Sequence, residues 1–546
     1  MNTTRKYSAR QIAEALYEYG IRDVVVSPGS RNTPLIIALD ADRRLHKHVI
    51  IDERSAAFAA LGMSLETGCP VACVCTSGSA VLNYAPAVAE AYYRGVPLVM
   101  ISADRPAEWI DQDDSQTIRQ YGVMSNFVKG SYNIADCGDN PDSIVDRTIN
   151  DALSTALGRR KGPVHINMEF DEPLGEYVET DVDFRRIICQ GSEFKDVVLP
   201  DMPYERILIV AGFHSRDSVY SGLLERIQSE CGIPVLCEVQ SNVAGINASS
   251  ALKYLGKFDD NDFNASEFVP ELVISLGGAV VSKSLKSFLR DNSIPEHWYV
   301  GFSEHAIDCY RKLTRRFDLD ATIFLEALYR KYSARPALSY GRLWRQLSEK
   351  ADRYISRYIA DAPWCGMKAM KCLLDAATGA SLHIGNGTAI RLAQFCDCGR
   401  WKSIECNRGV SGIDGSLSTA AGAALTGAPV MLVCGDMSAQ YDMGALAIAD
   451  VPDSFRLVVL DNRGGGIFRM IASTKEMESD MREYYYSGNV NLPLSGLADS
   501  FGFEYFEASS EEGLLRVYAE FLACKRKAVL RIATDPDVDT AVFNAL

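Results

Sequence analysis

The sequence predicts an α/β protein of three doubly wound parallel-sheet domains, of which the first and third are related. Short apolar runs of strand length alternate with longer helical patterns along most of the 546 residues. This alternation is typical of parallel sheets that helices cover on both faces. One stretch of the chain also recurs far downstream within the same order of elements. The predicted domains cover residues 1–190, 200–332 and 340–546.

The repeat relates the first predicted domain to the third. Thr67-Gly-Cys-Pro-Val71 recurs without gaps as Thr426-Gly-Ala-Pro-Val430. An Ala- and Gly-rich helical pattern precedes each copy, at residues 56–65 and 416–425, and a small-residue helix and an apolar strand follow each. Chance gives a short match but not the same order of elements around it, so we interpret the two domains as copies.

The region between the copies also alternates strands and helices. Apolar runs at residues 207–211, 235–239, 272–276 and 298–301 are of strand length, with helical pattern between most of them. This alternation predicts the remaining doubly wound sheet.

The composition favours a cytoplasmic protein with small-molecule partners. A formal charge of −15 argues against nucleic acid and means that an anionic substrate needs a local basic pocket. The first 20 residues lack a signal-peptide core and no apolar run could span a bilayer, so we expect no membrane insertion. The 15 cysteines show no zinc-type spacing, which indicates reduced, buried thiols. For Cys396-Asp-Cys398 a metal site is the less favoured alternative.

The most informative polar residues follow two neighbouring strands of the third domain. Asp436 comes after the apolar run 430–434, and Asn462 and the glycines 464–466 come after the run 457–460. The carboxyl ends of parallel strands meet at one sheet edge, where open α/β folds bind ligands. A carboxylate, an amide oxygen and a loop carbonyl suit a hard divalent cation that keeps positions for phosphate, although Asp and Asn are also common in turns. The pattern resembles that of thiamine-diphosphate enzymes, which hold the cofactor's diphosphate through magnesium.

The two copies differ where this chemistry would lie. Ser77 occupies the position of Asp436, so only the third domain supplies the metal carboxylate. Only the first copy has Glu53 between a strand and its helix. By the resemblance, Glu53 hydrogen-bonds the aminopyrimidine and assists loss of the thiazolium C2 proton, which requires a dry environment. The alternative is an acid that stabilises the start of a helix.

Arginines follow the ends of several predicted strands. They lie in the loops Ser27-Pro-Gly-Ser-Arg-Asn-Thr-Pro34, Ser102-Ala-Asp-Arg105, Gly385-Asn-Gly-Thr-Ala-Ile-Arg391 and Asn407-Arg408. Arg binds carboxylates bidentately, so four arginines at sheet edges of an acidic protein predict substrates with several carboxylates. Each one alone is also compatible with a structural or surface ion pair. Gln116 and Lys283 are weaker candidates for the same role.

Five motifs occur together in this chain. They are residues 27–34, Thr76-Ser-Gly-Ser-Ala80, Ser102-Ala-Asp-Arg-Pro106, Asn407-Arg-Gly-Val-Ser-Gly-Ile-Asp-Gly415 and Gly464-Gly-Gly-Ile-Phe468. The combination resembles the family of 2-succinyl-5-enolpyruvyl-6-hydroxy-3-cyclohexene-1-carboxylate (SEPHCHC) synthases of menaquinone biosynthesis. The resemblance implies domains of the thiamine-diphosphate enzyme type and a transferase reaction. In that reaction 2-oxoglutarate is decarboxylated and the resulting succinyl carbanion adds to isochorismate, which gives SEPHCHC.

The resemblance also implies which residues form the site. Glu53 is the catalytic residue, and the ligands of Mg²⁺, for which Mn²⁺ can substitute, are Asp436, Asn462 and the Gly464 carbonyl. The substrate-binding residues are Ser30, Arg31, Arg105, Gln116, Lys283, Arg391 and Arg408. The cofactor-binding residues are Thr76, Ser77, Gly78, Gly387, Asp436, Met437, Ser438, Asn462, Gly464, Ile467 and Phe468. Ile467, Phe468 and Ile471 would form an apolar wall near the thiazolium, although Ile471 is equally compatible with ordinary core packing. The active sites are expected between the subunits of a homodimer or homotetramer.

Three positions differ from the family pattern. Met437 replaces the second glycine after the metal Asp of many thiamine enzymes, Ser284 follows Lys283 where Arg is expected, and Gly387 replaces an expected Ser. These differences concern substrate contacts and leave the cofactor assignment unchanged.

Three other classes compete with this interpretation. An acetolactate synthase or 2-keto-acid decarboxylase takes monocarboxylates and needs fewer arginines, and the middle domain shows no convincing flavin site. A binding protein that has lost the chemistry has little reason to retain Glu53. A nicotinamide enzyme lacks support, since the glycines 464–466 do not have GxGxxG spacing.

Overall fold

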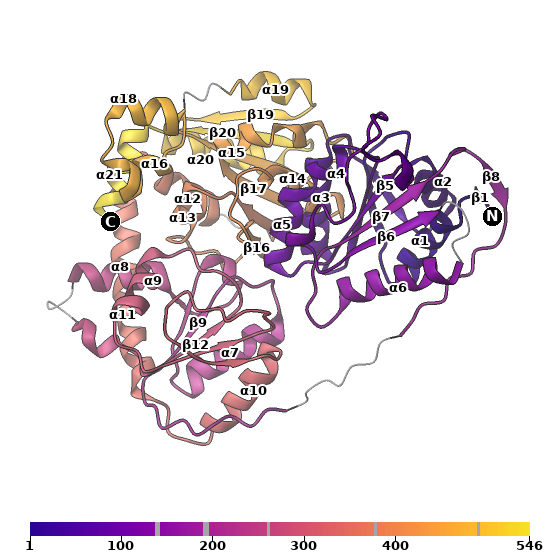
Figure 1. The fold of residues 1–546 in the computed structure, drawn as a ribbon. Coiled ribbons are helices and arrows are strands. Elements are labelled where there is room, and N and C mark those ends of the chain that lie inside the picture. The colour runs from indigo at the N-terminus through magenta and orange to yellow at the C-terminus, as the bar shows by residue number, and fades with distance from the viewer. Residues whose placement is uncertain (137–141, 189–195, 259–262, 376–378, 489–491) are drawn as a thin grey trace.

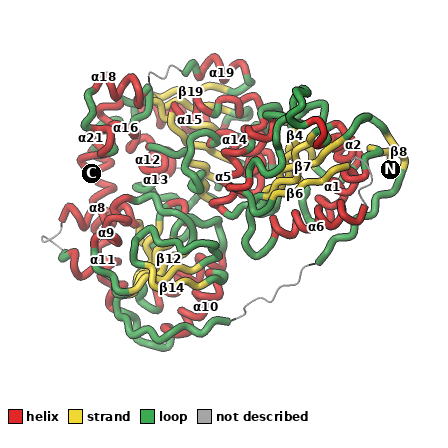
Figure 2. The backbone as a smooth tube through the Cα atoms, in the orientation of Figure 1, coloured by secondary structure: helices red, strands yellow, loops and turns green. Residues whose placement is uncertain are grey.

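The computed structural model describes the chain except for residues 137–141, 189–195, 259–262, 376–378 and 489–491. The described part contains three six-stranded sheets and one two-stranded sheet. Figure 1 shows the first and third sheets next to each other, with the middle sheet below the third. In Figure 2 the strands of each sheet lie among helices. The predicted α/β class with three parallel sheets is confirmed.

The first sheet has the strand order β3-β2-β4-β5-β7-β6, and all its pairs are parallel. Its strands are β2 (Asp23–Val26), β3 (His46–Val49), β4 (Val71–Cys75), β5 (Leu98–Asp104), β6 (Ser131–Asp136) and β7 (Val164–Phe170). Its helices are α1 (Tyr7–Glu18), α2 (Thr33–Ala41), α3 (Glu53–Thr67), α4 (Ala80–Asn83), α5 (Ala85–Arg94) and α6 (Asp142–Leu157). The short strands β1 (Asn2–Thr4) and β8 (Tyr177–Glu179) form an antiparallel pair beside it. Helices cover both faces, which is why the apolar strands β4, β5 and β7 are buried along their whole length.

The middle sheet has the parallel order β11-β10-β9-β12-β13-β14. Its strands are β9 (Ile207–Ala211), β10 (Val235–Cys237), β11 (Ile246–Asn247), β12 (Leu272–Leu276), β13 (Glu296–Val300) and β14 (Leu313–Phe317). The helices in this part are α7 (Ser218–Glu230), α8 (Ala248–Phe258), α9 (Lys283–Asp291), α10 (Ala321–Tyr332) and α11 (Ser339–Asp361). The prediction extended β10 to residue 239, but the strand ends before Glu238, whose carboxylate accepts hydrogen bonds from backbone N–H groups instead.

The third sheet has the parallel order β16-β15-β17-β18-β20-β19. Its strands are β15 (Ser381–Ile384), β16 (Ser403–Glu405), β17 (Val430–Gly435), β18 (Arg456–Asp461), β19 (Glu504–Ala508) and β20 (Ala528–Ala533). The helices are α12 (Gly366–Asp375), α13 (Thr388–Ala393), α14 (Ser416–Leu425), α15 (Asp436–Tyr441), α16 (Ile467–Met470), α17 (Ala472–Lys475), α18 (Ser479–Arg482), α19 (Leu494–Ser500), α20 (Glu511–Ala523) and α21 (Pro536–Ala545). Counted along the chain, its strands follow the same spatial order as those of the first sheet. The predicted relation between the two copies therefore extends to their topology.

The repeated helices α3 and α14 pack directly against each other. A Cβ atom on Gly62 would lie 1.8 Å from the carbonyl oxygen of Thr419, and one on Gly422 would lie 2.0 Å from that of Ala59. Both contacts require glycine, because any side chain would overlap the backbone of the facing helix. One hydrophobic core runs through this contact, from β4 and β5 of the first sheet to β17 and β18 of the third.

The middle sheet is packed separately. Its two faces belong to two clusters of buried residues that contain no residue of the first or third sheet. Within the described residues, no helix is both long and apolar enough to cross a membrane. The three sheets span residues 23–170, 207–317 and 381–533. The domain limits remain predictions, and residue 190 lies outside the described residues.

Candidate active site

Asp436 lies at the carboxyl edge of the third sheet, where β17 ends and α15 begins. The residue is 2% exposed. It accepts hydrogen bonds from the backbone N–H of Gly464 (2.8 Å) and of Met437 (2.7 Å). Burial raises its pKa to about 7, and the neighbouring Asp461 adds to the rise. Strands β17 and β18 thus bring together the Asp and the glycine loop that the sequence placed at this edge.

Asn462 follows β18 and faces the same space. Its Nδ2 donates to Asp539 Oδ2 at 3.3 Å. Asp539 also accepts from the Gly366 N–H (2.7 Å) and the Thr534 hydroxyl (2.8 Å), so its position is fixed from three sides. Because Nδ2 is used by Asp539, the amide oxygen Oδ1 is left for a ligand. Gly466 makes this possible, since a Cβ there would lie 2.5 Å from Nδ2.

A cavity of about 150 Å³ opens in front of these groups. The predicted cofactor residues that line it are Gly387, Asp436, Met437, Ser438, Asn462, Gly464, Ile467 and Phe468. Gly387 has a φ of 85°, a conformation that favours glycine over the expected Ser, and a Cβ there would meet nothing within 4 Å. The structure therefore brings together the cofactor residues predicted in the third domain.

The donor set of this cavity fits a metal-bound diphosphate. The Asp436 carboxylate, the Asn462 amide oxygen and the Gly464 carbonyl would hold a hard cation and leave its other positions for phosphate and water. The described residues contain no group of three or more His, Cys, Asp and Glu side chains that could hold a metal ion, so a cation here would also need the amide and carbonyl oxygens. The cavity also offers room, since a Cβ on Gly435 would meet no atom within 4 Å.

A second cavity, of about 190 Å³, holds two of the predicted substrate residues. Lys283 and Arg391 line it together with Ile471, and Ile467 lines both cavities. The Arg391 guanidinium donates to the Gly387 carbonyl at 2.5 Å. Burial lowers the pKa of Arg391, and the nearby Arg408 lowers it further. A group that is desolvated and repelled by a neighbouring cation gains from an anionic ligand.

Arg408 lies in the loop that follows β16. Its Nη1 donates to Asn386 Oδ1 at 3.1 Å, while its Nε is buried and has no hydrogen-bond partner among the described residues. Asn386 in turn donates to the carbonyls of Asn407 (2.6 Å) and Gly412 (2.7 Å), which ties the loop to the end of β15. An unpaired buried donor is costly, so Nε is a natural site for a carboxylate oxygen.

The remaining predicted substrate residues gather at the carboxyl edge of the first sheet. Arg31 is buried; its N–H donates to the Thr76 hydroxyl (3.2 Å) and its guanidinium contacts Glu172 (3.2 Å). Burial lowers the pKa of Arg31, and Arg105 lowers it further. Arg105 is itself paired with Asp114 at 2.9 Å. Two cations therefore lie close together at this edge as well.

The loop after β4 completes this edge. It contains Thr76 and Ser77, both buried, and Gly78, whose φ is 83°. The backbone of Gln116 lies against Gly78, at 3.3 Å from the position of a Cβ, and the Gln116 side chain is exposed. Ser30 is exposed in the neighbouring loop, where its carbonyl accepts from Thr33. None of these first-domain residues lines the cavities around Asp436 and Lys283.

Glu53 is the first residue of α3. The N-cap of this helix is Asp52, which accepts from the N–H groups of Arg54 and Ser55, so helix capping does not depend on Glu53. Glu53 accepts a hydrogen bond from Asn83 at 3.2 Å and is partly exposed. It does not line the Asp436 cavity of its own chain. The dry environment that its predicted role requires is not provided by one chain alone.

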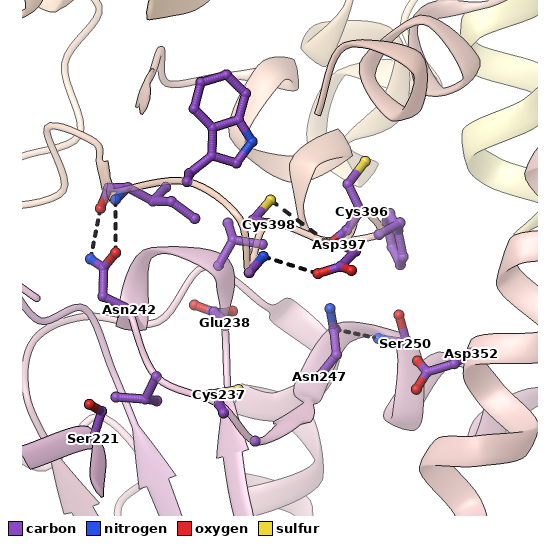
Figure 3. Close-up of a pocket in the computed structure, with 18 of the residues that line it drawn as sticks. Ser221, Cys237, Glu238, Asn242, Asn247, Ser250, Asp352, Cys396, Asp397 and Cys398 are labelled. Carbon is purple, nitrogen blue, oxygen red and sulfur yellow. Dashed lines mark hydrogen bonds between the residues drawn. The ribbon is translucent and has the colours of Figure 1, made fainter. Parts of the chain in front are cut away.

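Another cavity, of about 680 Å³, lies between the middle and third sheets (Figure 3). Figure 3 shows Cys396, Asp397 and Cys398 on one side and Glu238 and Asn242 on the other. None of the predicted site residues lines it. Burial raises the pKa of Cys396 well above its ordinary value and that of Cys398 to about 12, so both thiols stay protonated. Cys396 is buried and Cys398 is partly buried.

Sequence reasoning missed several residues that shape the site. Asp539 orients Asn462, and Lys253 lines the Lys283 cavity with its ammonium 5.2 Å from the centre of the Phe543 ring. Glu90, in α5, contacts the loop of Arg408. The only sequence signal was weak: Glu90 is a lone acid on an otherwise small and apolar helix face.

The fold and this edge of the third sheet define a thiamine pyrophosphate enzyme. Residues 7–123 match the N-terminal thiamine pyrophosphate binding domain, residues 170–368 the middle domain, and residues 384–532 the C-terminal thiamine pyrophosphate binding domain of these enzymes. The relatives narrow this class, because those most similar in sequence carry one and the same name, 2-succinyl-5-enolpyruvyl-6-hydroxy-3-cyclohexene-1-carboxylate synthase. The chain belongs to this synthase family.

Three relatives illustrate the extent of the similarity. The synthase of Porphyromonas gingivalis is 36% identical, over 96% of this chain and 93% of that protein. The synthase of Flavobacterium psychrophilum is 36% identical, over 98% and 97%. The synthase of Bacteroides thetaiotaomicron is 32% identical, over 98% of each chain. The similarity therefore includes the middle region, which contains none of the five motifs.

Proposed function

We propose that the protein decarboxylates 2-oxoglutarate and transfers the remaining succinyl unit to isochorismate, which forms SEPHCHC for menaquinone biosynthesis. The observation that carries this proposal is the cavity of Lys283 and Arg391, which shares the lining residue Ile467 with the Asp436 cavity. Two cations beside the cofactor position suit a dicarboxylate better than a monocarboxylate. The name of the relatives, a succinyl-bearing cyclohexene carboxylate synthase, agrees with this chemistry.

The cofactor would bind at the carboxyl edge of the third sheet. Asp436, Asn462 and the Gly464 carbonyl would hold Mg²⁺ or Mn²⁺, and through it the diphosphate. Ile467 and Phe468 would form the apolar wall beside the thiazolium. When bound, thiamine diphosphate supplies the carbon nucleophile and accepts the electrons that departing carbon dioxide leaves behind. The protein positions the reacting groups and excludes water around them.

Different substrate carboxylates would bind at the arginine-bearing edges of the first and third sheets. Arg391, Arg408 and Lys283 would hold carboxylates near the diphosphate domain. Arg31 and Arg105, with Ser30 and Gln116, would hold them at the edge of the first sheet. Since burial already disfavours the charge of Arg31 and Arg391, a bound carboxylate would relieve a cost present in the free protein.

We infer that the complete site contains residues of two subunits. Glu53, Thr76, Ser77 and Gly78 lie at the first-sheet edge, and none of them lines the Asp436 cavity of the same chain. A second copy could present this edge to that cavity, so that Glu53 exchanges a proton with the aminopyrimidine in an enclosed space. A homodimer is the smallest assembly that meets this requirement.

Substrate and cofactor tests separate this proposal from its rivals. We expect calorimetry to detect thiamine diphosphate binding that depends on Mg²⁺, and 2-oxoglutarate to be consumed when isochorismate is present. Pyruvate should not be consumed. Turnover of pyruvate alone would reject the dicarboxylate assignment in favour of an acetolactate synthase or a simple decarboxylase. Tight cofactor binding without turnover of any 2-keto acid would favour a binding protein that has lost the chemistry.

A further inference from the structure

Helix α5 of the first domain contacts the loop that carries Arg408 in the third. Glu90 lies in α5 and is 0% exposed. Its Oε1 accepts from the Gly409 N–H and its Oε2 from the Val410 N–H, both at 2.7 Å. The two residues bound by this carboxylate directly follow Arg408. The contact therefore joins distant parts of the sequence at a predicted substrate residue.

A second residue of the same helix strengthens the contact. The Arg94 side chain is fully buried, and its guanidinium donates to the Glu405 carboxylate (2.6 Å) and the Cys406 carbonyl (3.2 Å). Glu405 ends β16, and Figure 1 shows α5 next to that strand. The loop is thus held by α5 on both sides of Arg408.

The spacing between helix and loop leaves no room for adjustment. A Cβ on Gly409 would lie 2.6 Å from the Glu90 carbonyl oxygen and 3.1 Å from Arg94 Cγ. Glycine at this position lets the loop backbone approach the helix closely enough for both carboxylate bonds.

The pairing pattern leaves the Nε of Arg408 available. Both Glu90 oxygens bind backbone N–H groups, not the guanidinium, whose Nε remains buried without a partner among the described residues. A carboxylate bonded to Arg408 itself would compete with an acidic substrate. A carboxylate bonded to the next two N–H groups orients the loop without that competition.

We propose that Glu90 is a positioning residue for substrate binding, which acts by holding the Arg408 loop so that the guanidinium points at a substrate carboxylate. This proposal rests on the proposed function of Arg408. It adds a second task for the first domain: besides offering Glu53 to a partner's site, it shapes the site of its own chain.

A double-mutant cycle with Arg408 tests the proposal. In Glu90→Gln the side-chain amide faces an N–H donor, so one of the two bonds is lost and the loop shifts. Arg408→Lys first identifies the substrate whose KM depends on Arg408. For that substrate we expect Glu90→Gln to raise the KM about tenfold and to change kcat less. We expect the KM of the double variant, Glu90→Gln with Arg408→Lys, to be little higher than that of Arg408→Lys alone, because both changes remove the same interaction.

Binding measurements give a readout that does not depend on turnover. The Kd of glutarate, a dicarboxylate without the reactive keto group, should rise in Glu90→Gln, while the Kd of thiamine diphosphate with Mg²⁺ and the melting temperature stay close to those of the wild type. Gly409→Ala offers a second route, because it keeps Glu90 but pushes the loop away from α5, and it should reproduce the same change. Glu271→Gln is the control: Glu271 also accepts two consecutive backbone N–H groups, from Glu205 and Arg206, but it precedes β12 of the middle sheet, where no predicted site residue receives its bonds.

The outcomes separate a positioning role from a structural one. Multiplicative effects of Glu90→Gln and Arg408→Lys, or an unchanged glutarate Kd in both Glu90→Gln and Gly409→Ala, would overturn the proposal. So would a loss of cofactor affinity together with melting temperature, since that would indicate a general structural role. If the wild type binds glutarate but does not turn over 2-oxoglutarate, the proposed function fails while the cycle on glutarate binding still decides the role of Glu90.

Discussion

The first and third domains share one scaffold but carry different chemistry. Their sheets have the same strand order, and their related helices α3 and α14 pack against each other. After the corresponding strands β4 and β17, however, the first copy has Ser77 and the third has Asp436. Ser77 belongs to a loop packed beside Arg31 and Gln116, whereas Asp436 faces a cavity and binds the glycine loop.

The comparison shows that the scaffold alone does not decide what a sheet edge binds. Both edges carry an arginine whose pKa is lowered by burial, the buried Arg31 in one and the half-buried Arg391 in the other, so both suit anionic groups. At the third edge, Asp436, Asn462 and Gly464 also line a cavity. Function therefore depends on a few loop residues placed on a symmetric frame.

The largest expected effect comes from Glu53, which has no counterpart in the third domain. Glu53→Gln should lower the decarboxylation rate at least a hundredfold, because the amide cannot exchange the required proton. Calorimetry should show nearly unchanged affinity for Mg²⁺ and thiamine diphosphate. Wild-type activity in this variant would contradict the proposal that the first domain supplies the catalytic carboxylate and the third domain the cofactor site.

Substitution of Asp436, unlike that of Glu53, should weaken cofactor binding itself. Asp436→Asn removes the charge of the proposed metal ligand and should weaken Mg²⁺-dependent cofactor binding about ten- to a hundredfold, measured by titration calorimetry. Ser77→Ala, at the corresponding position of the first copy, is the matched control and should leave metal affinity unchanged. Equal losses in the two variants would mean that the copies share the metal site.

Substitutions at the contact between α3 and α14, in contrast, should destabilise the protein to a similar extent in either domain. Gly62→Ala and Gly422→Ala each force a methyl group into the backbone of the facing helix and should cost about 1–3 kcal/mol or more of the free energy of unfolding. Gly222→Ala is the control, since this helical glycine in α7 has no neighbour within 4 Å of a Cβ. Chemical denaturation measures all three, and a neutral Gly62→Ala would contradict the close contact of α3 with α14.

The smallest effect concerns two buried histidines, one in each of these sheets. Burial lowers the pKa of His165 to about 4 and that of His383 to about 3, from an ordinary value of 6.5. Both are neutral in the folded protein and take up protons on unfolding in acid, so stability is present above pH 6.5 and is lost as the pH falls towards the folded-state values. The expected loss is about 1 kcal/mol for each histidine between pH 6.5 and 5.5.

The pH dependence is checked by denaturation of single variants. His165→Gln and His383→Gln should each flatten the fall in stability with acid, whereas the exposed His305→Gln should leave its slope unchanged. A slope unaffected by either buried substitution would show that other groups govern acid stability.

Much of the fold and part of the site follow from the sequence. The strands that flank Asp436 and Asn462 are continuous apolar runs, and parallel pairing brings their carboxyl ends together without further information. The polar edge strand β14, Leu-Thr-Arg-Arg-Phe, has no such signal and was not predicted. Glu90 and Asp539 also escaped prediction, because each acts on a loop far away in sequence and no local pattern encodes such a contact.

The contact between α3 and α14 also constrains how this chain can change over evolution. Gly62 touches the backbone of the third domain and Gly422 touches that of the first, inside one continuous core. A larger residue on either side would need a compensating shift on the other. The loops of the two related domains can therefore diverge independently, whereas substitutions at the contact between α3 and α14 must be compensated in the facing helix.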